Sequence, residues 1–226
     1  SFLTSVTFII VLFIPVAIKY LSLLEPTGGD YFNALTYAIH FARHLPFPPT
    51  GWLSFWHEGA PVIGGYPTFI FYLMSPLFKT MDIAQAMETF SIAGIWAFVL
   101  FSFVLFWVIT KSSPISFFLA LIILSTRATY YQLFAEGLVV GSFSQFLAPL
   151  TFIFIYLFIR NEKADKRSLV LGSITSGIAI LTHPAISFLT VITPGTVILL
   201  LNFLLKKAGL VNIFKNLVIY LGIAFG

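Results

Sequence analysis

Residues 28–67 form a polar stretch in an otherwise apolar chain, and they hold most of the side chains that could do chemistry. Three of the four histidines and two of the four tryptophans lie there, together with Asp30 and Glu58. A carboxylate can act as a general base or bind a hard cation, and an imidazole can bind a metal or a phosphate. Because ionisable side chains are costly near lipid, their concentration in residues 28–67 predicts that this segment binds a polar ligand.

Residues 30–45 have the pattern of an amphipathic helix. Polar residues recur at steps of three or four, within a sector of about 80°, and apolar residues lie opposite. The polar residues are Asp30, Asn33, Tyr37, His40 and His44. One interpretation makes Asp30 a base or metal ligand and the two histidines a ligand pair or phosphate donors. The other makes Asp30 an N-cap after two glycines and places the histidines at the membrane interface.

The turn-rich segment that follows adds aromatic and acidic groups. Trp52 and Trp56 either belong to an aromatic belt at the headgroup level or form a wall for a sugar or lipid. Glu58 lies in a Gly- and Pro-containing turn that could direct its carboxylate, and His57 precedes it. Both interpretations of the tryptophans remain open at this point.

Polar residues also stand near the ends of later apolar segments. Arg127 and Glu136 lie in a second polar segment, where they form either a structural ion pair or part of a phosphate site. His183 precedes Pro184, which disfavours helix at the histidine. The imidazole then lines a cavity or bonds a freed carbonyl.

The composition is that of an integral membrane protein. The chain is 59% hydrophobic and 9% charged, whereas a soluble domain has about 25% charged residues. We therefore predict an all-α polytopic bundle of about seven spans. The expected spans are 2–24, 84–110, 113–126, 142–160, 168–182, 185–205 and 213 onward. There is no cysteine, which excludes thiolate chemistry in this chain, and the net charge of +4 gives no nucleic-acid signal.

The charged residues orient these spans. If residues 66–79 are too short and too broken by proline to cross, eight of the twelve basic residues fall on one side, and six of the eight acids fall on the other. Residues 160–167 are then cytoplasmic, 25–83 form a first outer loop with interfacial helices, and 127–141 form a second outer segment. We expect the plasma (inner) membrane of a prokaryote. Because the sequence starts without Met and ends in an apolar run, we expect part of a longer chain.

The order of short motifs resembles multi-span glycosyltransferases of the GT-C type. It is most similar to the branch labelled as 6-pyruvoyl-tetrahydropterin-synthase-related membrane proteins, although no residue here indicates pterin chemistry. The motifs are Asp30 after the first span, the Pro-x-x-Gly-Trp turn ending at Trp52, the Gly-Ala-Pro turn ending at Pro61, Gly65-Tyr66-Pro67, Arg127, Glu136-Gly137, Ala148-Pro149-Leu150 and Leu181-Thr182-His183-Pro184.

The resemblance implies transfer of a sugar from a polyprenyl-phosphate donor to an acceptor at the outer face, with residues 1–226 as the N-terminal part of the transmembrane domain. Asp30 matches the catalytic carboxylate, and Glu58 and Glu136 are expected to assist it. A divalent cation, Mg²⁺ or Mn²⁺, would be bound by Asp30 and Glu136. The substrate-binding residues would be Arg127 and His183 at the phosphate, Trp52 and Trp56 at the sugar, and also His57 and Tyr66.

The chain departs from that pattern, and this keeps a second function open. No acidic pair follows the first span, and no soluble acceptor-binding domain is present in the sequence. The alternative is a non-catalytic membrane subunit of a larger complex, for example respiratory or transport, on a GT-C-like scaffold. The expected partners are a lipid-linked sugar and membrane lipid, or other membrane subunits, and not nucleic acid. Haem is not expected, because three of the four histidines lie in one outer loop.

Overall fold

The computed structural model describes residues 1–23, 29–44, 52–53, 60–61, 69–126, 139–160, 166–205 and 210–226. In these residues the protein is helical, apart from one antiparallel pair of two-residue strands in which Trp52 lies opposite Pro61. The elements are α1 (Phe2–Leu23), α2 (Gly29–His44), β1 (Trp52–Leu53), β2 (Ala60–Pro61), α4 (Phe69–Met74), a 3₁₀ turn η1 (Leu77–Lys79), α5 (Ile83–Thr110), α6 (Ser113–Ser125), α8 (Val139–Phe146), α9 (Ala148–Arg160), α10 (Lys166–Thr182), α11 (Pro184–Ser187), a π-helical turn η2 (Phe188–Ile192), α12 (Thr193–Leu205) and α13 (Leu210–Phe225).

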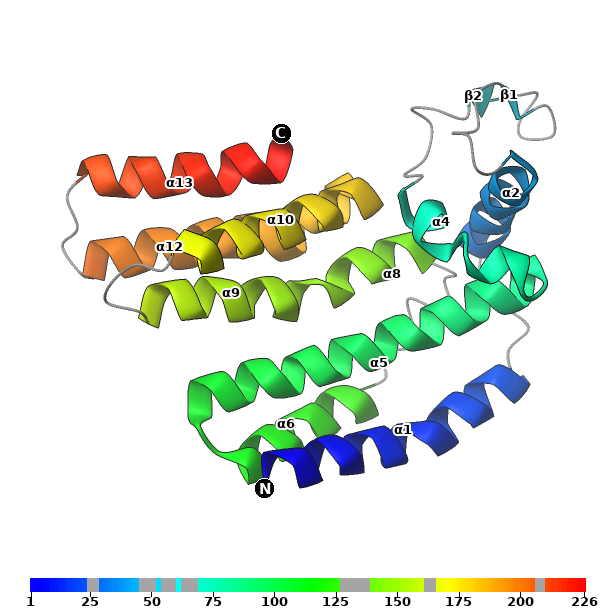
Figure 1. The fold of residues 1–226 in the computed structure, drawn as a ribbon, viewed down its shortest axis with the longest axis horizontal. Helices are drawn as coiled ribbons and strands as arrows, with labels where there is room; N and C mark the ends of the chain where they lie inside the picture. Colours follow the sequence, from blue (N-terminus) through cyan, green and yellow to red (C-terminus); the bar gives the residue numbers. More distant parts are fainter. Residues whose placement is uncertain are drawn as a thin grey trace.

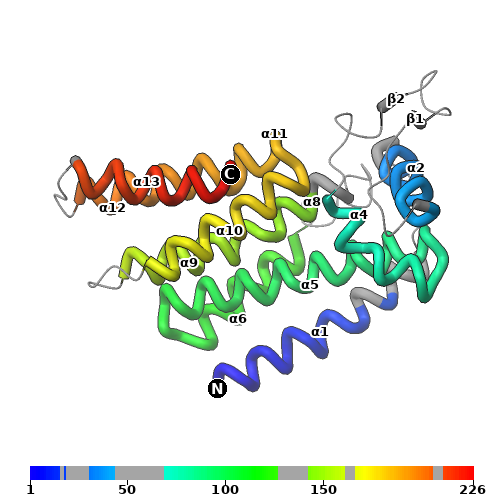
Figure 2. Tube along the Cα trace, turned by 45° about the horizontal axis from the view of Figure 1, so that its top comes forward, coloured from blue at the N-terminus to red at the C-terminus, as the bar shows by residue number. Residues whose placement is uncertain are grey.

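The long helices run side by side and alternate in direction, while α2, α4 and the β1–β2 pair gather at one end of the bundle (Figure 1). We call this the α2 end. The turned view in Figure 2 shows the same arrangement. The C-terminal ends of α5, α9 and α12 lie at the opposite end. All the polar motifs of the first loop that the structure describes are therefore held at one end of the bundle.

The predicted helices are present in all seven apolar segments. Three of them are long and apolar enough to cross a bilayer, judged by length and composition among the described residues: Ile83–Thr110, Ser142–Arg160 and Pro184–Leu205. Among the other segments, α10 with 17 residues is about 26 Å long, less than a hydrocarbon core of about 30 Å. The all-helical prediction is confirmed, and a count of seven spans stays a prediction.

Local chemistry explains where α5 begins and ends. The Asp82 carboxylate accepts a hydrogen bond from the Gln85 N–H at 3.0 Å, which is an ordinary N-cap. At the other end Lys111 adopts a left-handed conformation with φ 59°, and its N–H bonds the Trp107 carbonyl. Within α4 and η1, no helix exceeds six residues. Residues 69–79 are therefore too short to span a bilayer, as the prolines of this segment predict.

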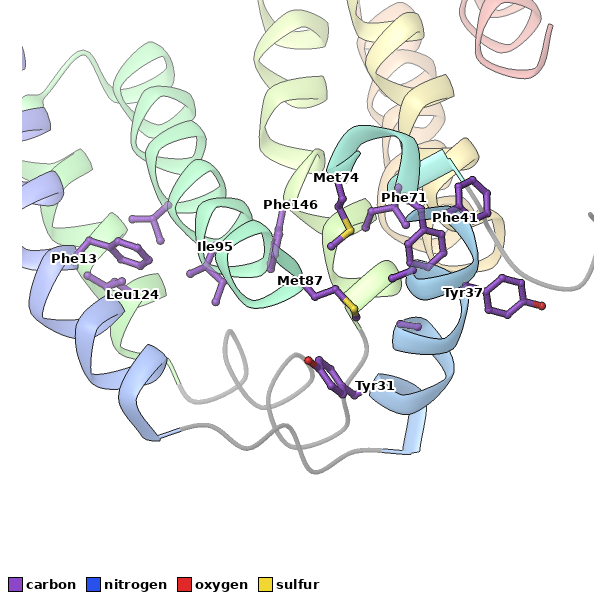
Figure 3. Packing of buried hydrophobic residues seen from close by; sticks show 14 of the residues in the cluster. Phe13, Tyr31, Tyr37, Phe41, Phe71, Met74, Met87, Ile95, Leu124 and Phe146 are labelled. Carbon is purple, nitrogen blue, oxygen red and sulfur yellow. The ribbon is translucent and has the colours of Figure 1, made fainter. Parts of the chain in front are cut away.

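Two apolar clusters hold the bundle together. The larger joins α1, α2, α4, α5, α6 and α8, and its buried aromatic and sulfur-containing side chains meet between α2, α4 and α5 (Figure 3). Phe41 of α2 packs against Phe71 of α4 with ring centroids 5.4 Å apart. The smaller cluster joins α9, α10, α12 and α13 around Leu169 and Tyr220. The larger cluster positions α2 on the bundle, and thereby fixes the candidate site.

Helix α10 lies between α9 and α13 and presents small and hydroxyl side chains to both. The Thr151 hydroxyl donates to the Thr175 hydroxyl at 2.9 Å, and the hydroxyls of Ser176 and Tyr220 are 2.9 Å apart. Small residues let helices approach closely inside a membrane, where packing and polar contacts replace the hydrophobic drive. This explains why a helix of modest hydropathy occupies the centre of the smaller cluster.

Candidate functional site

Helix α2 faces the bundle with a different side from the one that its polar stripe predicts. Its buried side chains are aromatic or small and follow helical spacing: Tyr31, Ala34, Tyr37, Ala38 and Phe41. Phe32, which is 60% exposed, and Arg43 lie on the outer side. At about 100° per residue the predicted stripe overlaps the buried face. The stripe therefore borders the protein core.

Tyr37 shows why the stripe turns inward. Its ring is buried and stacks on Phe71 of α4 with centroids 6.2 Å apart. A tyrosine has an apolar body with one polar tip, so it can serve a core face while counting as polar in a pattern. His40 follows one turn later and is half-buried on the same side. This orientation of α2 thus places some of its polar side chains at the edge of the core.

Tyr31 is the clearest polar group that this packing buries. The residue is 6% exposed, and in the described part of the chain its hydroxyl has no hydrogen-bond partner. Figure 3 shows its ring leaving α2 on the side of Met87, which belongs to the first turns of α5. A buried hydroxyl without a partner costs free energy, because its hydration is lost and not replaced. Such a group in a native fold is a candidate for ligand binding.

Two carboxylates lie close enough to Tyr31 to affect its ionisation. Burial, and to a smaller extent the charges of Glu88 and Asp82, raise the pKa of Tyr31 from 10.0 to about 12. The phenol is therefore protonated at every physiological pH and can donate a hydrogen bond. Asp82 caps α5 and is exposed, whereas Glu88 is half-buried. We call Tyr31, Asp82 and Glu88 the acidic cluster.

An apolar groove of about 400 Å³ lies between α1 and α5. Among the residues that the structure describes, its polar lining residues are Thr89, which follows Glu88 in the chain, and Trp96, about two helical turns further along α5. The groove is lined by Ile10, Phe13, Ile14, Ile18, Thr89, Ile92, Ala93 and Trp96. The Trp96 indole nitrogen is buried and has no hydrogen-bond acceptor in the described part of the structure. Helix α5 thus carries both a member of the acidic cluster, Glu88, and the next residue, Thr89, in the lining of the groove.

His183 lies at the predicted break between α10 and α11, with an extended backbone at φ −160°. Its Nδ1 accepts a long hydrogen bond of 3.4 Å from the Ile186 N–H, so the imidazole caps α11. The break predicted from Pro184 is therefore confirmed, and the imidazole bonds a backbone N–H where a bond to a freed carbonyl was one expectation. Its predicted role at a phosphate stays a prediction.

Helix α8 connects the two halves of the candidate region. It contacts α2, which begins near Asp30, and also α10 and α11, between which His183 lies. One turn into α8 the Ser142 hydroxyl is buried, again without a partner among the described residues. Whether the side chains of Asp30 and His183 come together stays a prediction.

The other predicted site residues lie largely beyond what the structure describes. Asp30 is the second residue of α2 and Trp52 lies in β1, but the side chains of both are outside the described part. The remaining predicted residues fall wholly outside the described ranges: Trp56, His57, Glu58, Tyr66, Arg127 and Glu136. The described residues contain no group of three or more His, Cys, Asp or Glu that could hold a metal.

Sequence reasoning missed Tyr31, Glu88 and Trp96 as site residues. Glu88 carried a usable signal, since an acidic residue in the first turns of a long apolar segment is costly and marks a functional candidate. Tyr31 stands next to Asp30, yet its aromatic ring reads as core in any pattern. Trp96 carried no signal, because an indole among apolar residues is ordinary in a membrane helix.

Comparison with known proteins adds a family and no activity. The chain matches the family described as "6-pyruvoyl-tetrahydropterin synthase related domain; membrane protein" over residues 65–226. No curated protein and no solved structure matches the chain. The matched segment includes α4 to α13, and thus Asp82, Glu88 and His183. The chain therefore belongs to the family of 6-pyruvoyl-tetrahydropterin synthase related membrane proteins.

Proposed function

We propose that this protein is a membrane glycosyltransferase of the GT-C type, which transfers a sugar from a polyprenyl-phosphate donor to an acceptor at the outer face. The observation that supports the proposal is that the first turns of α5 carry Glu88 of the acidic cluster and, next to it in the chain, Thr89 of an apolar groove. A ligand that fits both has a polar head and a hydrocarbon chain. A lipid-linked sugar has that form.

The charge of the cluster suggests which part of the substrate it meets. Carboxylates repel a phosphate and accept hydrogen bonds from sugar hydroxyls. Asp82, Glu88 and the neutral Tyr31 hydroxyl thus suit the sugar or the acceptor. The phosphate would be bound by basic groups, for which Arg127 and His183 are the candidates. Asp30, one residue from Tyr31, would act as the general base on the attacking hydroxyl.

A divalent cation is part of the proposal through the resemblance only. Asp30 and Glu136 would hold it, since carboxylate oxygens are the ligands that Mg²⁺ and Mn²⁺ prefer. When bound, the cation would neutralise charge on the donor phosphate. Asp82 and Glu88 are the carboxylates whose side chains the structure describes.

The test is the Asp30→Asn variant of the full chain, reconstituted in vesicles with a polyprenyl-phosphate-linked sugar. The amide keeps the shape and much of the N-capping ability but removes the basicity. We expect transfer to fall by about 10²–10⁴-fold, as for loss of a general base. Stability should change by no more than about 1 kcal/mol, the cost of a cap.

Two outcomes contradict the proposal. If Asp30→Asn transfers at the wild-type rate, Asp30 is a cap and the mechanism is wrong. If the wild-type chain transfers no sugar from any polyprenyl-phosphate donor and purifies in fixed ratio with other membrane proteins, the non-catalytic subunit replaces the enzyme.

A further inference from the structure

We infer that the end of the bundle opposite α2 binds the headgroups of anionic phospholipids, with Lys111 as a principal contact. We call it the basic end. Its described cations are all exposed and belong to helix ends or first turns that lie on this side of the bundle (Figure 1): Lys111, Arg160, Lys166, Arg167 and Lys215. The inference does not rest on the proposed function, whose site lies at the α2 end.

The basic end has a large excess of positive charge. The two carboxylates whose side chains the structure describes, Asp82 and Glu88, lie at the α2 end. By sequence, the segments 161–165 and 206–209, which follow α9 and α12, add three lysines and two acids to the five described cations. Eight positive and two negative charges then give this end a net charge of +6. Such an excess attracts an anionic surface.

The charge-free length of α5 sets the depth of Lys111. Residues 89–110 contain no charged side chain, and as a helix they are about 33 Å long. This length matches a hydrocarbon core of about 30 Å. Because α5 is a candidate span that ends at Thr110, Lys111 lies where hydrocarbon gives way to headgroups. The candidate span Ser142–Arg160 likewise ends in a cation.

Exposed apolar side chains beside these cations favour bilayer lipid over a soluble anionic partner. Ile109 is 49% exposed two residues before Lys111, and Leu157 is 37% exposed one turn before Arg160. In a bilayer these apolar side chains contact hydrocarbon, while the long cationic side chains reach the headgroup layer. A phospholipid offers both a hydrocarbon chain and a phosphate in that arrangement, whereas a soluble protein offers only the charge.

Lys111 is the cation with the most unusual setting. Its backbone φ is 59°, the only positive φ at a residue other than glycine in the described part of the chain, and a helix end in this conformation favours glycine. Its Nζ lies 5.2 Å from the centre of the Trp107 ring, within the range of a cation–π contact. A lysine at this position is unfavourable for the isolated backbone, and an anionic headgroup bound to its ammonium would offset that cost.

The experiment counts bound lipids. The full-length protein, in micelles of a neutral detergent, is mixed with equal amounts of dioleoylphosphatidylglycerol and dioleoylphosphatidylcholine, and bound lipids are identified by native mass spectrometry. We expect phosphatidylglycerol to bind in preference. Lys111→Gln should lower its affinity about fivefold, which corresponds to the attraction of one cation near an anionic surface. Lys111→Gly should lower it equally while folding at least as well in neutral micelles, since glycine suits the backbone there.

Lys79→Gln is the matched control, because Lys79 is also exposed but lies between α4 and α5 at the α2 end. It removes the same charge and should leave phosphatidylglycerol binding within twofold of the wild type. The inference is overturned if the two lipids bind equally, if Lys111→Gln binds like the wild type, or if Lys79→Gln lowers binding as much as Lys111→Gln. Displacement of the lipid by inorganic phosphate, but not by chloride at equal ionic strength, would assign the surface to a soluble anion and also overturn it.

Discussion

Replacing Tyr31 by phenylalanine should move stability and ligand binding in opposite directions. The substitution removes one hydroxyl and keeps the ring in the core between α2 and α5. In the described structure that hydroxyl is buried and has no hydrogen-bond partner. If it is reserved for a ligand, the empty protein carries its desolvation cost, and the phenylalanine variant does not.

The magnitude follows from the hydrogen bond that is absent. An unsatisfied buried polar group costs about 1–3 kcal/mol, so Tyr31→Phe should be as stable as the wild type or more stable by up to that amount. A ligand bond from a neutral hydroxyl contributes about 0.5–1.5 kcal/mol, and about 1.5–3 when the acceptor is charged. Ligand affinity should therefore fall by roughly 2- to 150-fold.

Tyr220→Phe is the matched control. Tyr220 is also buried, but its hydroxyl is 2.9 Å from that of Ser176. Removing it breaks an existing bond, so we expect a loss of about 1 kcal/mol in stability and no change in ligand affinity. Unfolding by sodium dodecyl sulfate in mixed micelles gives the two stabilities, and polyprenyl-phosphate sugar binding to the same preparations gives the affinities.

The dependence of stability on alkaline pH gives a second test of Tyr31. Because burial raises the pKa of Tyr31 from 10.0 to about 12, the folded protein keeps this proton while the unfolded chain loses it. Stability from this group is thus fully present below pH 10 and declines as the pH rises towards 12. That decline should be smaller in Tyr31→Phe. A variant that loses more than about 1 kcal/mol of stability, as Tyr220→Phe should, would refute the reasoning, since the hydroxyl would then be bonded in the empty protein.

Two further predictions concern packing and orientation. A methyl group at Gly195 would overlap the Tyr220 hydroxyl and lie 3.0 Å from an Ile155 carbon, whereas Gly222 has open space. Gly195→Ala should therefore lower the free energy of unfolding by about 1–2 kcal/mol, and Gly222→Ala should raise it by up to about 1 kcal/mol. Equal free energies of unfolding in the two variants would contradict the packing described. In this cysteine-free chain, cysteines at the exposed positions Thr80 and Lys166 should react with an impermeant thiol reagent in intact cells at 80 only, and labelling at 166 alone would invert the topology.

The structure accounts for the charge asymmetry on which that topology rests. Lys111, Arg160 and Lys166 lie at the turns opposite the α2 end, and Asp82 and Glu88 lie at the α2 end. Loop charges are local features of the sequence, and alternation of the helices sorts them to the two ends. Family membership makes the chain a membrane protein, and the side on which each end lies follows from the positive-inside rule as a prediction.

The sequence by itself determined where the helices are. Apolar runs of sufficient length, the cap at Asp82 and the proline after His183 act within a few residues of the chain, so they could be read without knowing what packs on what. The same holds for the helical nature of residues 29–44. The polar stripe on that helix was also visible, because it depends only on spacing.

The tertiary structure alone decided which way that stripe faces and which residues of other helices lie next to it. Tyr37 faces the core because Phe71 of a separate short helix offers its ring a partner, a contact that spacing within α2 does not encode. Tyr31 and Glu88 meet because α2 folds back onto the start of α5, and the groove exists because α1 and α5 leave space between them. Secondary structure follows from interactions between near neighbours, whereas these sites depend on pairing between distant segments, which only the packing of the whole bundle selects.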